Sequence, residues 1–192
     1  VIDTGSGLMH DKLCVIDNNA VMTGSMNPTD RDTTTNNNNL IFIYSDQIAK
    51  LYHAEFWELW NKEKNKPTPI NNFKLNNTFI SVYFCPEDHC ADKVIKELRK
   101  AQNSIYFMTF SFTHIGITNA LLASVNRSVG VKGVFEKTQI SQYSSYEILK
   151  FQGIDVIIDN NKYNMHHKVF IIDDETVITG SFNPTAGGDG KN

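Results

Sequence analysis

Two sets of polar side chains, each with a histidine, a lysine, a serine and an asparagine, lie 156 residues apart at matching offsets. Imidazole can act as a nucleophile or a general acid, while ammonium, hydroxyl and amide groups stabilise charge that develops on oxygen. This inventory suits a phosphodiester at its pentacovalent transition state, with no metal ion or other cofactor required. We therefore expect one phosphate-handling site assembled from two halves. The sets are His10, Lys12, Ser25 and Asn27, and His166, Lys168, Ser181 and Asn183.

The residues around these sets form an internal repeat. Without a gap, residues 9–29 and 165–185 agree at 12 of 21 positions. In each copy His-x-Lys is followed by an aspartate, Asp17 or Asp173, and then by Gly-Ser-x-Asn. We expect both aspartates at strand ends, where a carboxylate can accept backbone N–H bonds across a turn.

A strand explains the His-x-Lys spacing, because residues i and i+2 of a strand point to the same face. His10 and Lys12 should therefore emerge together. In the second copy only His166, and not His167, has a lysine two residues on and an aspartate seven residues on. His166 is thus the predicted motif histidine.

The apolar pattern predicts strands that alternate with helices, which indicates a layered α/β fold with a largely parallel sheet and an antiparallel pair at each motif. After the first motif we expect a strand at 40–45 and a helix, capped by Asp46, that runs to 62. The expected domains are 1–62, a linker at 63–77, and 78–192. In the last domain the predicted strands are 78–84, 104–112, 130–136 and 154–159, and the predicted helices are 88–102, 115–127 and 139–152.

Alignment of the repeats predicts that both are incomplete. Residues 1–3 align with 157–159, at the end of a strand, and Asn192 aligns with Asn36. Repeat one would then lack its leading strands, and repeat two its last strand and helix.

Composition limits the partners and the compartment. The 192 residues carry a net charge of −3, which argues against a generally basic nucleic-acid-binding surface but allows a locally cationic cleft. No run of about 18 apolar residues is present. Three cysteines fit a reducing compartment, so the cytoplasm is favoured while the compartment stays open. For Cys85 and Cys90 a helix start is preferred over a metal site or a local disulfide.

The motif His-x-Lys-x4-Asp-x6-Gly-Ser-x-Asn, present twice, resembles the phospholipase D superfamily. The resemblance implies layered α/β/α domains in two pseudo-symmetric repeats and a monomer whose single site is pseudo-dimeric. It also implies a two-step reaction through a covalent phosphohistidine, without a metal, that ends in hydrolysis or in transfer to an alcohol. Members of the superfamily include phospholipases D, phospholipid synthases and metal-independent nucleases.

Residue by residue, the resemblance makes the two motif histidines the nucleophile and the general acid. Relatives often place Glu-Asn before the next strand, where the glutamate bonds the motif histidine, but this chain has Asn38-Asn39. An amide would only orient the ring, whereas a carboxylate would favour the imidazolium. We therefore expect His10 to be the neutral nucleophile and His166 the general acid. The phosphate would be held by Lys12, Lys168, Asn27 and Asn183 with support from Ser25 and Ser181, while Asp17 and Asp173 would brace the motif loops.

Three functions remain open at this point. The first is hydrolysis of phospholipid headgroups, the second is a nuclease on the same fold, and the third is an inactive truncation. The compact spacing of the motifs favours a small nuclease-like scaffold, whereas the acidic balance and the lack of arginine clusters favour the phospholipid.

Overall fold

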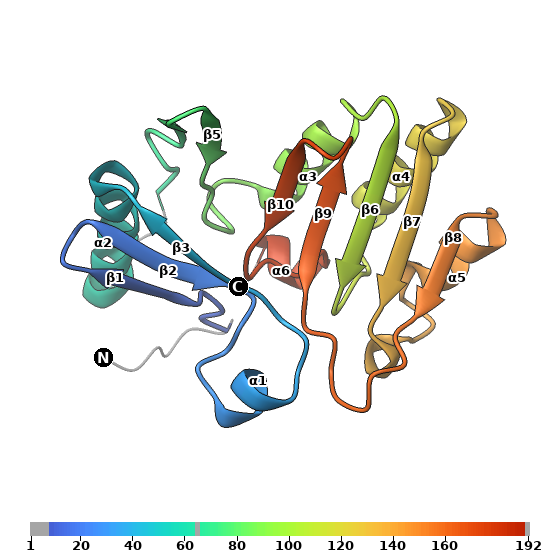
Figure 1. The fold of residues 1–192 in the computed structure, drawn as a ribbon, viewed down its shortest axis with the longest axis horizontal. Helices are drawn as coiled ribbons and strands as arrows, with labels where there is room; N and C mark the ends of the chain where they lie inside the picture. Colours follow the sequence, from blue (N-terminus) through green and yellow to red (C-terminus); the bar gives the residue numbers. More distant parts are fainter. Residues whose placement is uncertain (1–7, 64–65, 191–192) are drawn as a thin grey trace.

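The computed structural model describes residues 8–63 and 66–190, which form two α/β lobes that lie side by side (Figure 1). The smaller lobe holds an antiparallel sheet in the order β1-β2-β3, with a long helix, α2, packed against it. A short helix, α1, lies in the connection between β2 and β3. These elements are β1 (Leu13–Ile16), β2 (Ala20–Gly24), α1 (Asp30–Thr34), β3 (Leu40–Tyr44) and α2 (Asp46–Asn61).

The larger lobe is built on a five-stranded sheet in the order β10-β9-β6-β7-β8. Strands β6, β7 and β8 are parallel, and the motif strand β9 is antiparallel to both β6 and β10. This arrangement confirms the predicted α/β fold with an antiparallel motif pair beside a parallel sheet. The strands are β6 (Ser104–Thr109), β7 (Gly130–Phe135), β8 (Asp155–Ile158), β9 (Lys168–Ile172) and β10 (Thr176–Thr179).

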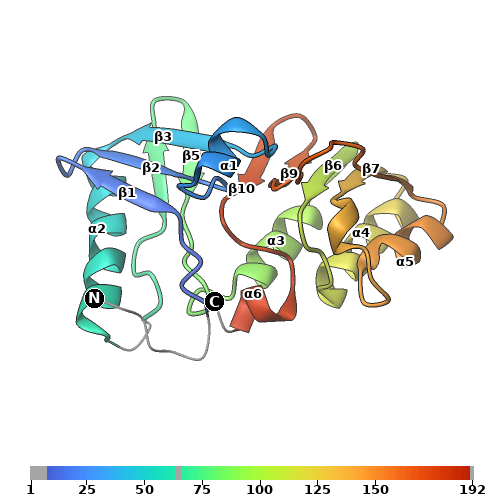
Figure 2. The same ribbon diagram turned by 90° about the horizontal axis from the view of Figure 1, so that it is seen from below.

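Helices α3, α4 and α5 cover one face of the larger sheet (Figure 2). Helices α4 and α5 connect successive parallel strands, as a parallel sheet requires. The helices are α3 (Cys90–Leu98), α4 (Ile115–Asn126), the 3₁₀ turn η1 (Lys137–Gln139), α5 (Ser145–Phe151) and α6 (Ala186–Gly190). The predicted helices at 88–102 and 139–152 are therefore shorter than expected.

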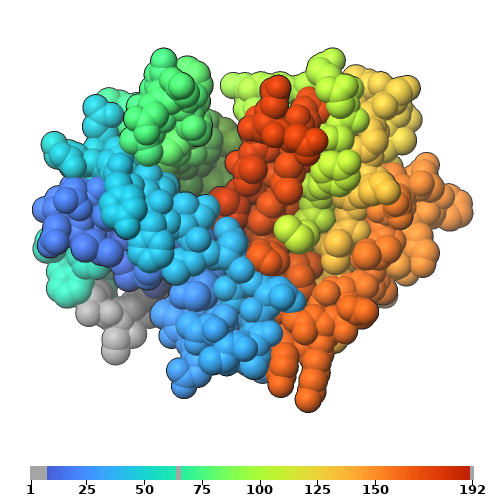
Figure 3. Space-filling model, in the orientation of Figure 1, coloured from blue at the N-terminus to red at the C-terminus, as the bar shows by residue number. Residues whose placement is uncertain are grey.

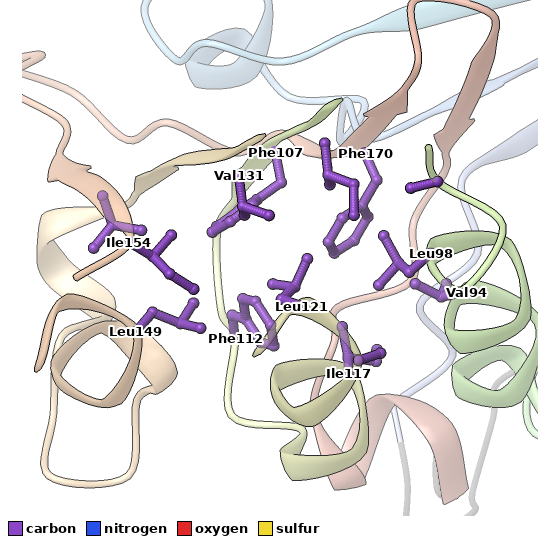
Figure 4. Close-up of a cluster of buried hydrophobic side chains, with 14 of the residues drawn as sticks. Val94, Leu98, Phe107, Phe112, Ile117, Leu121, Val131, Leu149, Ile154 and Phe170 are labelled. Carbon is purple, nitrogen blue, oxygen red and sulfur yellow. The ribbon is translucent and has the colours of Figure 1, made fainter. Parts of the chain in front are cut away.

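The main core lies between the larger sheet and its helices, where aromatic rings from neighbouring strands meet (Figure 4). Phe107 packs edge to face on Phe112 and Phe135, at centroid distances of 5.8 and 5.4 Å. Gly133 makes room for one of these rings, because a Cβ there would lie 2.0 Å from Cζ of Phe107. The core therefore fixes strand β6, which pairs with the second motif strand, against β7.

The second core joins the smaller lobe to the segment that follows α2. Val82 and Phe84 pack with Ile48 and Tyr52 of α2. The strand expected at 78–84 forms over Thr78–Ser81 as β5. It pairs with β4 (Asn72–Leu75), inside the expected linker, and it does not belong to the five-stranded sheet.

The residues of the turn between β4 and β5 explain why β5 pairs with β4 and not with the larger sheet. Residues 76 and 77, both asparagine, join two short alternating runs, and Asn76 has a left-handed backbone with φ 53°. Such a pair favours a two-residue hairpin. The chain therefore pairs locally before it can enter the larger sheet.

The starts of two helices, α2 and α3, also differ from what the sequence predicts. The N-cap of α2 is Ser45, whose hydroxyl accepts the N–H of Ile48 at 3.4 Å, and Asp46 is the first helical residue. Cys85 and Cys90 form a disulfide, with Cys90 as the first residue of α3, and Cys14 is free and exposed. The preference against a local disulfide is therefore wrong, and α3 begins at Cys90 itself.

Across residues 8–63 and 66–190, each helix is either too short or too polar to cross a membrane.

Replacement of Phe112 by alanine tests the main core. Phe112 is 1% exposed, so loss of its ring should lower the free energy of unfolding by about 3–5 kcal/mol. Phe151→Ala is the matched control, because that ring is 88% exposed and its loss should change the free energy by less than about 0.5 kcal/mol. Urea denaturation of both variants gives the comparison, and equal losses would contradict this description of the core.

Candidate active site

Both motif histidines directly precede the motif strands, and both motifs fold in the same way. His10 lies three residues before β1, and His166 lies two residues before β9. The Nζ of Lys12 donates to the carbonyl of His10 at 2.8 Å, and the Nζ of Lys168 donates to the carbonyl of His166 at 2.9 Å. The strand expected to hold His-x-Lys begins only after the histidine in each copy. Each motif lysine nevertheless lies near the histidine of its own motif, whose pKa it lowers.

Each histidine ring is held by the opposite lobe. Nδ1 of His166 lies 3.0 Å from the backbone oxygen of Ser25, and the ring of His10 bonds the backbone of Ser181. A carbonyl only accepts, so Nδ1 of His166 must carry a proton. Nε2 of His166 is left for chemistry.

The connection between β2 and β3 carries the first lobe onto the second (Figure 3). The N–H of His166 donates to the carbonyl of Asn37 at 2.6 Å, and the N–H of Asn37 donates to the carbonyl of Asn164 at 2.9 Å. Further along, Nδ2 of Asn39 donates to Oγ1 of Thr179 at 2.9 Å. The loop after the first motif therefore serves the second histidine.

A buried glutamate at the end of β7 supports the same histidine from the other side. Glu136 is fully buried, and its carboxylate accepts the N–H of Met165 at 2.6 Å and that of Thr138 at 2.9 Å. Met165 directly precedes His166. The position of the second histidine is therefore fixed by both lobes.

The expected contact between the Asn38 amide and a motif histidine is not made. Nδ2 of Asn38 instead donates to the backbone oxygens of Asp32 and Asn36, at 2.6 and 3.3 Å. The loop crosses toward His166, so its amides do not lie beside His10 as the alignment assumed. The Asn38 amide therefore does not distinguish the roles of the two histidines.

The structure brings in a carboxylate that the motif did not include. Asp32, on α1, is 6% exposed, and its Oδ2 lies 3.7 Å from Nδ1 of His166. The same oxygen accepts the backbone N–H of Asn27 at 2.6 Å and its Nδ2 at 2.8 Å. One signal could have revealed it: the repeat places Asp32 opposite Gly188, so the copies differ in charge there.

The serines and asparagines of the two halves are not equivalent. The hydroxyl of Ser25 is used within its own lobe, where it donates to Oδ1 of Asn39 at 2.7 Å. Oδ1 of Asn183, in contrast, is buried and accepts no hydrogen bond from any residue that the structure describes. Asn183 lines a small cleft, and the other residues along it are His10, Asp11, Cys85, Ser181, Phe182 and Gly188.

The motif aspartates lie away from the histidines. Asp173 accepts the N–H groups of Gln102, Asn103 and Ser104 at 2.8, 2.7 and 2.9 Å. These residues lie at the start of β6, whereas His166 adjoins its end, about 20 Å away at the rise of a strand. Asp17 occupies the matching turn after β1, with a left-handed φ of 49°. Asp173 thus braces the fold, and neither aspartate belongs to the cleft.

Burial and mutual repulsion lower the pKa values of the basic groups of the site. Burial and the charges of Lys12, Lys168 and His166 lower the pKa of His10 to about 4. Burial and Lys168 also lower the pKa of His166 to about 4, against the opposing effect of Asp32. Burial and Lys12 lower the pKa of Lys168 to about 7. A bound anion would favour all of the charged forms.

In the part of the chain that the structure describes, His, Cys, Asp and Glu side chains do not form a group of three or more that could hold a metal ion.

The sequence and the fold both have known relatives. Residues 1–60 and 94–192 match the family described as "Cardiolipin synthase, PLD-like domain". Phospholipase D of Rickettsia bellii is 32% identical over 161 residues, which cover 80% of each chain. Phospholipase D of Rickettsia typhi is 36% identical over 120 residues, which cover 62% of this chain and 59% of the relative.

A solved structure agrees with these matches. Nuc, a phospholipase D family member from Salmonella typhimurium, is 36% identical, with a TM-score of 0.50 over 53% of this chain and 68% of that one. For three of the Rickettsia relatives, the matched part of this chain covers between 58% and 62% of their length.

Anion binding should be coupled to proton uptake at Lys168. At pH 7.5 a lysine with a pKa of about 7 is mostly neutral. When an anion binds and favours its charged form, Lys168 should take up as much as about 0.7 proton per bound anion. Calorimetric titration with sulfate, in two buffers of different ionisation enthalpy, measures the uptake. Lys168→Met should reduce it and weaken binding, while Lys100→Met, at an exposed lysine, should change neither. Unchanged uptake in Lys168→Met would contradict the assignment.

Proposed function

Because the chain belongs to the phospholipase D superfamily, we propose that it hydrolyses phosphodiester bonds through a covalent phosphohistidine, with a phospholipid as the substrate. One observation carries the proposal. Two imidazoles with lowered pKa values, one of them held through Nδ1 by the carbonyl of Ser25 in the opposite lobe, lie near the half-buried Lys12 and the buried Lys168. This arrangement supplies a nucleophile, a proton donor and cations for a phosphate without a metal ion.

In the first step the free ring nitrogen of His10 attacks phosphorus. The P–N bond forms as the bond from phosphorus to the leaving oxygen breaks, and His166 gives its proton to that oxygen. In the second step neutral His166 removes a proton from water, the water oxygen attacks phosphorus, and the P–N bond breaks. His10 is then free again, and a phosphate monoester leaves.

The remaining motif side chains stabilise charge on the phosphate oxygens. Lys12 and Lys168 supply positive charge, and burial makes their interaction with an anion stronger than it would be in water. The amide of Asn183 lines the cleft beside His10. The bound anion also raises the pKa of His166, so this residue gains its proton as the substrate binds.

Charges near the cleft favour a phospholipid over a nucleic acid. Glu55 is half-buried, and its pKa is raised to about 8 by burial and by repulsion from neighbouring carboxylates, among them Glu87 and Asp11. Asp11 itself lines the cleft. A cationic headgroup would favour the ionised forms of these carboxyl groups, whereas the further phosphates of a polyanionic strand would disfavour them.

The substrate class can be tested directly in the presence of EDTA. Vesicles of phosphatidylcholine should release choline, and single-stranded DNA should remain intact. Cleavage of DNA without release of choline would make the protein a nuclease. If neither substrate nor bis(4-nitrophenyl) phosphate is turned over, the proposed hydrolysis is contradicted.

The division of labour predicts where the covalent intermediate forms. His10→Asn should abolish the phosphoenzyme, and His166→Asn should let it accumulate on His10, with activity in each case reduced by about 10³-fold or more. Quenching at alkaline pH and mapping of the modified peptide measure this. His53→Asn, at an exposed histidine of α2, is the control and should behave like the wild type. A label on His166 would reverse the two roles.

A further inference from the structure

The two halves of the site differ at one buried position. Asp32 in the first repeat corresponds to Gly188 in the second. A Cβ on Gly188 would lie 2.3 Å from the backbone oxygen of Asn183, so the second repeat has no room for a side chain there. The half-site formed with Gly188 therefore lacks the carboxylate that the other half contains.

Neutral donors hold Asp32 in a fixed orientation. Its Oδ2 bonds the backbone and the side chain of Asn27, and its Oδ1 accepts Nδ2 of Asn36 at 2.5 Å. Burial disfavours the charge, yet these hydrogen bonds and the nearby His166 keep the pKa of Asp32 below its ordinary value. Asp32 is thus a buried, oriented carboxylate, and a motif histidine lies 3.7 Å away.

The charges around the two histidines differ in sign. His166 faces Lys168 from its own strand, Lys12 from the opposite motif and Asp32 from α1, and its ring packs on the edge of Phe110 at 4.6 Å. The charges that act on His10 come from Lys12, Lys168 and His166, and all of them are positive. Among the described residues, a carboxylate lies within 4 Å of the ring of His166, and none lies that close to the ring of His10.

We propose that Asp32 is the positioning residue that makes His166 the general acid of the reaction. It acts through His166 and does not contact the substrate. It stays ionised throughout, while the proton moves from His166 to the leaving oxygen. It also binds Asn27, so the first asparagine and the second histidine are held by one group. This inference rests on the phosphodiesterase activity proposed above.

The leaving group provides the test of Asp32. A general acid matters most when the leaving alcohol is a poor one, and its loss costs about 10²–10⁴-fold. In Asp32→Asn, kcat/KM should fall about 100-fold for diphenyl phosphate and by no more than about threefold for bis(4-nitrophenyl) phosphate. Asp30→Asn, which removes the same charge from an exposed position on α1, should leave both values unchanged.

The histidine titrations test the same coupling without turnover. Asp32 stabilises the imidazolium, so in the wild-type protein the His166 ring should titrate at a higher pH than the His10 ring in NMR spectra. Asp32→Asn should lower the pKa of His166, and Asp30→Asn should not. Because Lys12 and Lys168 act on both rings, the ring signals themselves must be followed, not activity.

Each outcome separates the possibilities. Equal losses with both esters, or the same selective loss in Asp30→Asn, would give Asp32 a merely structural role. If Asp32→Asn fails to fold, the order of titration in the wild type decides, and His10 above His166 would overturn the proposal. Absence of turnover by the wild type would count against the proposed function, while the titration order would still test the link between Asp32 and His166.

Discussion

The exchange of hydrogen bonds between each motif histidine and the backbone of the opposite lobe is the constraint on which the site depends. A buried carbonyl must find a donor, and the carbonyl of Ser25 finds it in the ring of His166. The same bond fixes which ring nitrogen is free. If the two lobes separated, the ring of His166 would lose both its burial and the bond that keeps the proton on Nδ1, and the chemistry needs both.

This constraint explains why the connection between β2 and β3 has so many polar contacts. It must pass from the first lobe to the second and still satisfy its own backbone groups. Asn37 pairs with residues 164 and 166, and Asn39 joins Ser25 to Thr179. A run of asparagines that looks like a plain surface loop in the sequence is the contact that positions the second histidine.

The electrostatics of the site follow from packing four basic side chains into one partly buried place. Without an anion, burial and then mutual repulsion disfavour their charged forms, so both imidazoles are neutral and Lys168 is close to half charged at neutral pH. A bound phosphodiester would reverse this balance. Asp32 breaks the symmetry between the repeats, because it lies beside one histidine and Gly188 stands at the matching place in the other copy.

The sequence by itself determined the parts of the site that depend on spacing along one strand: the shared face of His166 and Lys168, the return through Gly-Ser-x-Asn, and the aspartate at the strand end. Covalent geometry sets these relations, and the repeat makes them visible. The alternation of strands and helices was predictable for the same reason. Only the tertiary structure decided that the first loop reaches the second histidine, that Asp32 lies beside it, and that β5 pairs with β4. These contacts depend on how the two lobes and a polar hairpin pack together, and no local spacing encodes that packing.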